Sequence, residues 1–280
     1  MDIEEFKNHL ISDEKSEATV ERYMRDVTAY IAWRDGRKMS KELMIQYKVE
    51  LVDKYEPASV NTMLASLNAY FDYIGHSEYK VRNLKLQKTA YIEPKRDLTK
   101  EEYERLLKTA YDMGKHRIYY IMQTICSCGI RVSELRYITV EALKKGVAYI
   151  SNKGKNRRVY IPDTLSMLLQ PYILMKKIKS GSIFVTRTGK PIDRSNIWAE
   201  MKKLCKNAGV LASKVFPHNL RHLFARTYYK VHQDVVRLAD ILGHSSVNTT
   251  RIYTAESGEI HYKRIQILGL VIDLKCRNTT

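Results

Sequence analysis

The 280-residue sequence predicts a mainly α-helical protein with one small β-sheet, arranged as a helical N-terminal domain and a larger mixed α/β domain. Apolar residues recur at intervals of three and four along most of the chain, which is typical of amphipathic helices. Two short β-rich segments flank one turn-rich stretch and predict a hairpin. Residues 1–80 carry 11 basic and 15 acidic side chains, whereas residues 101–280 carry 31 and 14. We therefore expect two domains of different electrostatic character.

Three helices are expected within the first domain, residues 1–80. In the first and third, apolar side chains at helical spacing form a stripe that can be buried, and in each of the three a serine stands in the position of an N-cap. Glycines are placed where two of the helices should stop. The N-caps are Ser16, Ser40 and Ser59, and the helices end before Gly36, at about Lys54 and before Gly75.

Residues 81–97 are expected to form an exposed linker because they show no sustained period and contain Pro94 in a basic, polar setting. Residues 98–280 then form the second domain. A hairpin is predicted from 147–151 and 157–161 around the turn NKGKN, with a further strand at 183–186. Helices are expected at residues 99–113 and 119–126, after Gly129, and at 193–207, 220–231 and 234–242.

The composition favours a folded protein that binds nucleic acid. Hydrophobic residues make up 44% and charged residues 28%, with 12 Gly and 6 Pro, which excludes collagen-like and disordered classes. An excess of 48 basic over 31 acidic side chains gives a net charge of +17, concentrated in the second part. Four irregularly spaced cysteines form no disulfide framework, and neither a leader nor an apolar run of membrane-spanning length is found. We expect a cytoplasmic protein with no membrane association.

Two segments carry cations suited to phosphate chemistry. In GIRVSEL, Arg131 and Glu134 lie three apart on a predicted helix and face the same side. They form either a plain surface ion pair or a phosphate-binding guanidinium with an orienting carboxylate. The hairpin turn KGKNRR is most simply a solvated basic loop, but Lys153, or Lys155 two residues later, could donate a proton to a leaving oxygen.

The segment HNLRH offers two histidines four residues apart, His218 and His222. A metalloprotease would need a glutamate where Asn219 stands, and Arg221 would lie beside the cation, so a metal site is not favoured. His218 and Arg221 instead share a helix face and can grip one anionic group.

The segment LGHSSVNTTRIYT delivers Tyr253 nine residues after His244. Taken alone, this tyrosine is more often a packed aromatic than a nucleophile, and Tyr228 or Tyr229 could be nominated as easily.

Together these groups meet the requirements of metal-free phosphodiester cleavage. Arginine forks neutralise the non-bridging oxygens as charge develops, a tyrosine attacks and forms a covalent link, and a lysine protonates the leaving hydroxyl. Neither a P-loop nor an acidic cluster for magnesium is present in the sequence, so no cofactor is expected.

The four segments, in this order and spacing, resemble those of the tyrosine recombinases, or phage integrases, and in particular the compact Xer-like members. GIRVSEL is similar to the first-arginine box, NKGKNRRVYIP to the hairpin lysine, HNLRHLFART to the H-x-x-R box and LGHSSVNTTRIYT to the histidine-to-tyrosine box. SEATVERYMRDVTAYIAW resembles the start of the core-binding, SAM-like domain, so the resemblance covers nearly the whole chain.

The resemblance implies specific roles for the candidate residues. Tyr253 would be the nucleophile, Lys153 the general acid for the 5′-hydroxyl, and Glu134 the acidic residue that follows the first arginine. The scissile phosphate would be surrounded by Arg131, His218, Arg221 and His244.

The resemblance also implies a C-shaped clamp on duplex DNA and a homotetramer that passes through a Holliday junction, with a possible second recombinase or accessory protein. The C-terminal docking segment between protomers would use Ile265, Leu268, Leu270, Val271, Ile272 and Leu274, unless this tail packs on its own domain. Because the first domain is net acidic, its DNA contacts would come from a local stripe with Arg22, Arg25 and Lys48. The alternatives are type IB topoisomerase-like relaxation and a non-catalytic architectural protein.

Overall fold

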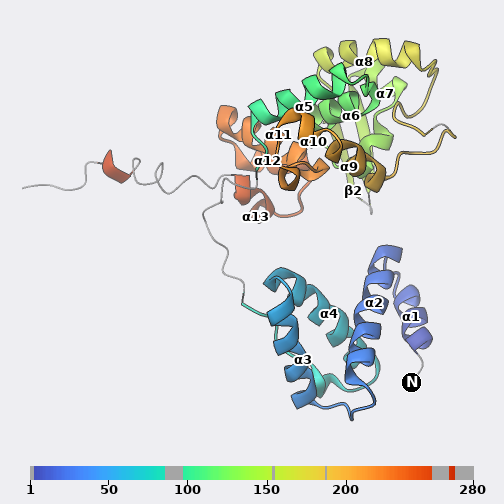
Figure 1. Cartoon of the computed structure of the whole chain (residues 1–280), viewed down its shortest axis with the longest axis vertical. Helices are drawn as coiled ribbons and strands as arrows, with labels where there is room; N and C mark the ends of the chain where they lie inside the picture. The colour runs from blue at the N-terminus through green and yellow to red at the C-terminus, as the bar shows by residue number, and fades with distance from the viewer. Residues whose placement is uncertain (1–2, 86–96, 153–154, 187, 254–264, 269–280) are drawn as a thin grey trace, which may run out of the picture. The chain divides into compact units, whose positions relative to one another are not determined.

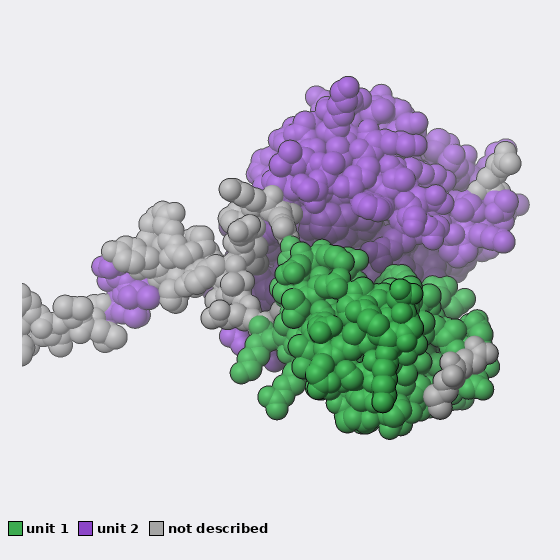
Figure 2. Space-filling view, turned by 60° about the horizontal axis from the view of Figure 1, so that its bottom comes forward, with its two compact units in different colours: residues 1–88 green, residues 89–280 purple. Residues whose placement is uncertain are grey.

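A computed structural model describes residues 3–85, 97–152, 155–186, 188–253 and 265–268, without the side chains of residues 152 and 155. The chain divides into two compact units, Met1–Lys88 and Thr89–Thr280 (Figure 2). Each has its own hydrophobic core. The mainly helical fold with one small sheet is confirmed (Figure 1).

The first unit is all helical. Its helices pack their apolar faces into one core, with α2 against α4 and α1 against α2. Phe6, Tyr30 and Phe71 are fully buried there, and the rings of Tyr30 and Phe71 meet edge to face. The elements are α1 (Ile3–Ser12), α2 (Glu17–Arg34), α3 (Lys41–Lys54), α4 (Pro57–Tyr73) and the 3-10 turn η1 (Ser77–Tyr79).

Of the three N-caps predicted in this unit, the structure confirms the positions of Ser16 and Ser40. The Ser40 side chain accepts a hydrogen bond from the backbone N–H of Leu43, as an N-cap should. Ser16 has the N-cap position of α2 but its hydroxyl pairs with the Thr19 hydroxyl. Ser59 as an N-cap is wrong: α4 begins at Pro57, because proline is pre-organised for the first helical position and lacks an N–H that would need a partner.

The exposed linker expected from residue 81 begins later, because Val81 and Leu84 pack on the core of the first unit. Val81 is buried, and its backbone N–H and carbonyl bond to the side chain of Asn68. Leu84 is held in the same way by Asn61. Two asparagine side chains thus bond to backbone groups that a helix or strand would otherwise pair. A search for hydrophobic periodicity does not detect this kind of support.

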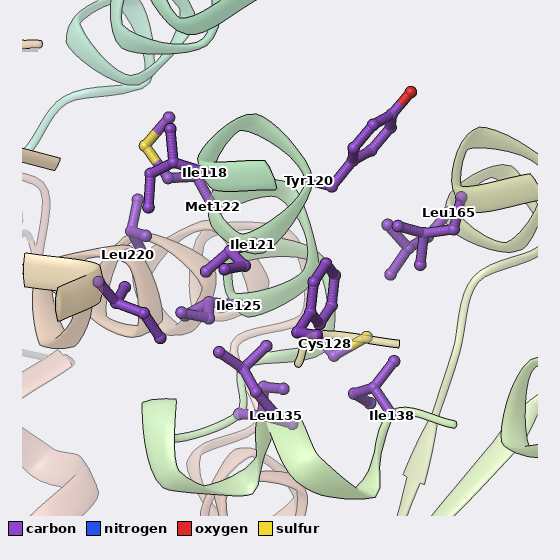
Figure 3. Close-up of a cluster of buried hydrophobic side chains, with 14 of the residues drawn as sticks. Ile118, Tyr120, Ile121, Met122, Ile125, Cys128, Leu135, Ile138, Leu165 and Leu220 are labelled. Atoms are coloured by element: carbon purple, nitrogen blue, oxygen red, sulfur yellow. The ribbon is translucent and has the colours of Figure 1, made fainter. Parts of the chain in front are cut away.

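The second unit is built around α6, a helix whose buried residues occupy most of its circumference. Figure 3 shows its side chains, among them Ile121 and Ile125, gathered with Leu135 of η3 and Leu220 of α11. The elements are α5 (Lys100–Asp112), α6 (His116–Cys128), η3 (Val132–Tyr137), α7 (Val140–Lys145), β1 (Val147–Asn152), β2 (Lys155–Tyr160), α8 (Asp163–Met175), α9 (Arg194–Lys202), α10 (Cys205–Ala208), η4 (Ala212–Lys214), α11 (Pro217–His232), α12 (Val235–Leu242), α13 (Val247–Thr250) and η5 (Arg251–Tyr253).

The hairpin has the predicted position, and β1 and β2 pair antiparallel with Ile150 opposite Arg157. Three other expectations are wrong. The helix expected after Gly129 is the 3-10 turn η3, and the helix expected over 193–207 is divided into α9 and α10. The strand expected at 183–186 does not form in the described chain. Ser182 and Val185 instead make isolated bridges to Thr139 and Pro191, because each of these segments offers single hydrogen bonds and no continuous strand edge.

Candidate active site

Three arginines from distant segments meet at one carboxylate. Arg131 precedes η3, Arg157 lies on β2 and Arg221 on α11; we call them the arginine cluster. Glu134 is buried at its centre. Its Oε1 accepts from Nη1 of Arg131 at 3.0 Å, and its Oε2 accepts from Nη2 of Arg157 at 2.6 Å and lies 4.0 Å from Nη1 of Arg221. The carboxylate fixes the guanidinium groups against their mutual repulsion.

Three successive carbonyl oxygens at the C-terminal end of α12 complete this arrangement. The Ile241 carbonyl accepts from Arg157, the Leu242 carbonyl from Arg221 at 2.6 Å, and the Gly243 carbonyl from Arg131 at 3.5 Å. The last carbonyls of a helix lack partners within the helix and carry its negative end. The end of α12 therefore spaces the three cations along one turn of backbone.

Two glycines make this close packing possible. Gly129 has φ +61°, and its carbonyl accepts from Nη1 of Arg221 at 2.7 Å. A Cβ at Gly243, where φ is +65°, would lie 2.5 Å from Cδ of Arg157, and one at Gly129 would lie 2.4 Å from the ring of Phe224. Both positions need the left-handed backbone and the missing side chain.

Burial differs sharply within the arginine cluster. The side chain of Arg221 is 1% exposed and that of Arg157 13%, whereas that of Arg131 is 38% exposed. Burial, with the charges of the other two arginines, lowers the pKa of Arg221 to about 10, so it stays charged at neutral pH. Arg131 is thus the member that faces solvent, with Arg221 behind it.

The two ring nitrogens of His244 contact Arg221 and Thr250. Its Nε2 lies 3.1 Å from Nη2 of Arg221, and its Nδ1 lies 2.8 Å from the hydroxyl of the fully buried Thr250. A guanidinium can only donate, so Nε2 accepts, and the ring proton is on Nδ1 and is donated to Thr250. Burial, followed by the charge of Arg221, lowers the pKa of His244 to about 4, which keeps this ring neutral.

Tyr253 is buried in η5, next to α11. Its ring and that of His222 pack edge to face with centroids 5.1 Å apart, and the centroid of His222 lies 4.3 Å from that of His218. Burial raises the pKa of Tyr253, and the charge of Arg221 opposes that shift. Burial lowers the pKa of His218, with Arg221 adding to the effect, and lowers that of His222 to about 3. The tyrosine therefore rests protonated beside neutral imidazoles.

The structure brings together most of the residues that the sequence nominated. Arg131, Glu134, Arg221 and His244 are in direct contact, and the charges of Arg221 and Arg131 reach Tyr253. A metal site at His218 and His222 would need further ligands. Among the described residues, no group of three His, Cys, Asp or Glu is placed to hold an ion. Lys153 lies outside the described residues, as does the side chain of Lys155.

The remaining predicted positions belong to the C-terminal segment and to the first unit. Of the C-terminal docking segment, Ile265 and Leu268 are exposed in a short turn, whereas Leu270, Val271, Ile272 and Leu274 lie outside the described residues. In the first unit, Arg25 pairs with Asp26, and Lys48 donates to the Arg82 carbonyl at 2.6 Å. The Arg22 guanidinium lies over the ring of Tyr23.

Sequence reasoning missed Arg157 and Thr250 as members of the site. The sequence groups Arg157 with the cations of a solvated turn, although strand alternation puts it on the same face as Val159 and opposite Ile150, both buried. That alternation could have identified it. No pattern in the sequence singles out Thr250 from Thr249.

Comparison with known families decides the chain's relationship. A model described as "Phage integrase family" matches residues 96–259, and one described as "Phage integrase, N-terminal SAM-like domain" matches residues 3–77. This chain belongs to the phage integrase family. The predicted resemblance to tyrosine recombinases is thereby confirmed.

Relatives of this integrase-family protein extend over nearly its full length. Tyrosine recombinase XerA of Thermococcus kodakarensis is 31% identical over 279 residues, which cover 97% of this chain and 96% of that protein. Tyrosine recombinase XerD of Halalkalibacterium halodurans is 26% identical over 262 residues, covering 85% and 87%. Across the described ranges, the helices are too short or too polar to cross a membrane.

Solved structures share the fold of this integrase-family protein. The Tn1549 transposon integrase in complex with transposon right end DNA has a TM-score of 0.72 at 18% identity, covering 95% of this chain and 98% of that one. The XerH recombinase bound to its difH substrate has a TM-score of 0.70 at 19% identity, covering 89% and 78%.

Proposed function

We propose that this chain is a site-specific DNA recombinase that cuts and rejoins duplex DNA through a 3′-phosphotyrosine formed by Tyr253. The contact network that joins Arg131, Glu134, Arg221 and His244 carries the proposal, because it concentrates donors beside a buried tyrosine. Membership of the family supplies the reaction class.

In this mechanism Arg131 and Arg221 bind the scissile phosphate. A phosphodiester resists attack because its own charge repels the nucleophile, and guanidinium donors neutralise that charge as the pentavalent state forms. Arg131 is the solvent-facing member and meets the phosphate first. His218 and His244, both held neutral, add donors or acceptors without adding repulsion between cations.

Tyr253 then forms the covalent intermediate. Its phenol loses a proton to a neutral histidine of the site, its oxygen bonds to phosphorus, and the bond from phosphorus to O5′ breaks. Lys153 is assigned the role of donating a proton to that leaving oxygen. Attack by a 5′-hydroxyl on the phosphotyrosine reverses the steps, so religation needs no external energy source.

Duplex DNA is the proposed partner. The relatives above include recombinases and integrases whose structures were solved with DNA, and the net charge of +17 suits a polyanion. We propose that residues 1–80 bind the core site, that the predicted linker 81–97 joins the units beyond the part held on the first unit by Asn61 and Asn68, and that 98–280 carry the chemistry. A C-shaped clamp, a homotetramer joined through the C-terminal segment, and a partner recombinase or accessory factor stay predictions from the resemblance.

Covalent capture from DNA of random sequence tests this function, because the protein itself selects its target. The protein is incubated with a pool of nicked random duplexes, denatured, and the DNA that stays attached is sequenced. We expect one enriched sequence family and no captured DNA with Tyr253→Phe, because the phenylalanine lacks the attacking oxygen. Tyr228→Phe is the matched control and should capture normally. Capture by Tyr253→Phe at the parental level would refute the assignment.

The enriched duplex then separates the alternatives. A recombinase joins strands from two different duplexes, whereas a topoisomerase-like enzyme only relaxes one. An architectural protein binds DNA and forms no adduct at all.

A further inference from the structure

The hairpin places its two adjacent arginines in opposite environments. Arg157 and Arg158 are neighbours on β2, and successive side chains of a strand point to opposite faces. Arg158 is exposed, opposite Tyr149, and its guanidinium carbon lies 5.9 Å from the centre of that ring. Arg157 points inward and its side chain is 13% exposed. The two cations of the same strand therefore cannot have the same role.

Arg157 joins three parts of the second unit. From β2 its Nη2 donates to Oε2 of Glu134 at 2.6 Å, and its Nη1 donates to the carbonyl of Ile241 at the end of α12. Its Cδ lies where Gly243 has no side chain. Glu134 in turn holds both the backbone N–H and the guanidinium of Arg131.

We propose that Arg157 is a positioning residue for strand cleavage: it fixes Glu134 and the end of α12, and through them the phosphate-binding Arg131 and the backbone that precedes His244. This inference rests on the proposed function. Both terminal nitrogens of Arg157 already bond to protein groups, and the carboxylate of Glu134 lies between it and Arg131. Arg157 therefore acts on the phosphate only through its neighbours.

The energetic reason is the cost of an unpartnered buried ion. Glu134 is buried and has three arginines around it; without Arg157, Oε2 keeps the Arg131 N–H at 2.7 Å and only the distant Arg221. Removing one partner of a buried ion pair leaves an uncompensated charge and is strongly destabilising. We therefore expect Glu134 to shift toward its remaining donors and Arg131, which is bonded to it, to shift as well. Partners that orient metal ligands typically contribute about 10- to 100-fold to activity, and we expect an orienting group in this metal-free site to contribute on the same order.

The test compares Arg157→Met with Arg158→Met on the captured, nicked duplex. Both changes remove one positive charge from the same strand and keep a long side chain. We expect Arg157→Met to lower the single-turnover rate constant of adduct formation at saturating protein by about 10- to 100-fold. Its DNA affinity should keep the parental salt dependence. Arg158→Met should keep the rate constant and reduce the salt slope by about one.

The rate constant distinguishes positioning from folding. A variant that is partly unfolded gives a smaller amplitude of adduct at an unchanged rate constant, whereas a misplaced site gives a slower rate constant. Arg157→Lys, which retains the charge but not the fork, should recover only part of the rate because one ammonium replaces two fixed donors. A parental rate constant in both Arg157 variants would overturn the proposal.

A double-mutant cycle with Glu134→Gln identifies the route. If Arg157 acts through Glu134, the double variant is about as slow as the slower single variant, and the two effects do not multiply. Multiplying effects would overturn the proposed route, and a reduced salt slope in Arg157→Met would show a direct phosphate contact instead. Failure of the parental chain to form any adduct would refute the recombinase function itself, which is a different outcome.

Discussion

Replacing Thr250 by valine removes one hydrogen bond from the site and keeps almost the same side-chain shape. The Thr250 hydroxyl lies 2.8 Å from Nδ1 of His244 and is fully buried. On the opposite side of the ring, Nε2 accepts from Arg221 at 3.1 Å. Valine leaves the Nδ1–H of His244 without its acceptor, next to a side chain that is fully buried.

The size of the effect follows from that lost partner. A buried donor left unsatisfied costs about 1–3 kcal/mol. The ring cannot escape by shifting its proton to Nε2, because that nitrogen would then face the donors of Arg221. We therefore expect Thr250→Val to lower the free energy of unfolding by about 1–3 kcal/mol. If His244 turns away in the folded protein, the same energy slows cleavage by about 5- to 150-fold, at 1.36 kcal/mol for each factor of ten.

Urea unfolding and single-turnover adduct formation measure the two effects separately. Thr249→Val is the matched control because Thr249 is exposed and adjacent, and it should leave both values within about 0.5 kcal/mol of the parent. Nitrogen-15 NMR of the histidine rings should find the His244 proton on Nδ1. Parental stability and rate in Thr250→Val, or a proton on Nε2 of His244, would contradict the argument.

Two further predictions concern stability. Because the native pKa values of His222 (about 3) and His244 (about 4) lie below that of a free histidine, the unfolded state binds more protons at mildly acidic pH. The free energy of unfolding should fall as pH is lowered through about 6.5, by up to about 1.4 kcal/mol per pH unit for each ring, in urea titrations at several pH values; a rise would contradict it. Gly129→Ala should destabilise the protein by about 1–3 kcal/mol more than Gly146→Ala, because both have positive φ but only the first meets Phe224. Equal losses in thermal or urea unfolding would show that the ring moves aside at no cost.

Local sequence determined many of the helices and the hairpin, because a single segment contains their signals. Thr99 and Glu102 form a capping box at the start of α5, and Gly243 ends α12 in the left-handed conformation. An error arose where two signals for a helix start lie close together: α4 begins at Pro57, and not after Ser59 as predicted. The four motifs likewise identified the family, since their residue types and order are properties of the chain alone.

Only the tertiary structure decided how the nominated residues work together. The bonds from Arg221 to Gly129 and from Arg131 to Gly243 join residues 92 and 112 positions apart. Strand alternation alone can show which hairpin arginine points inward, but the partners that it meets there, Glu134 and the end of α12, come from distant segments. The pairing of charges is set by neighbours in space, and no local period encodes it; for that reason the sequence named the chemical groups, whereas the fold alone assigned a proton to His244 and a partner to Arg157.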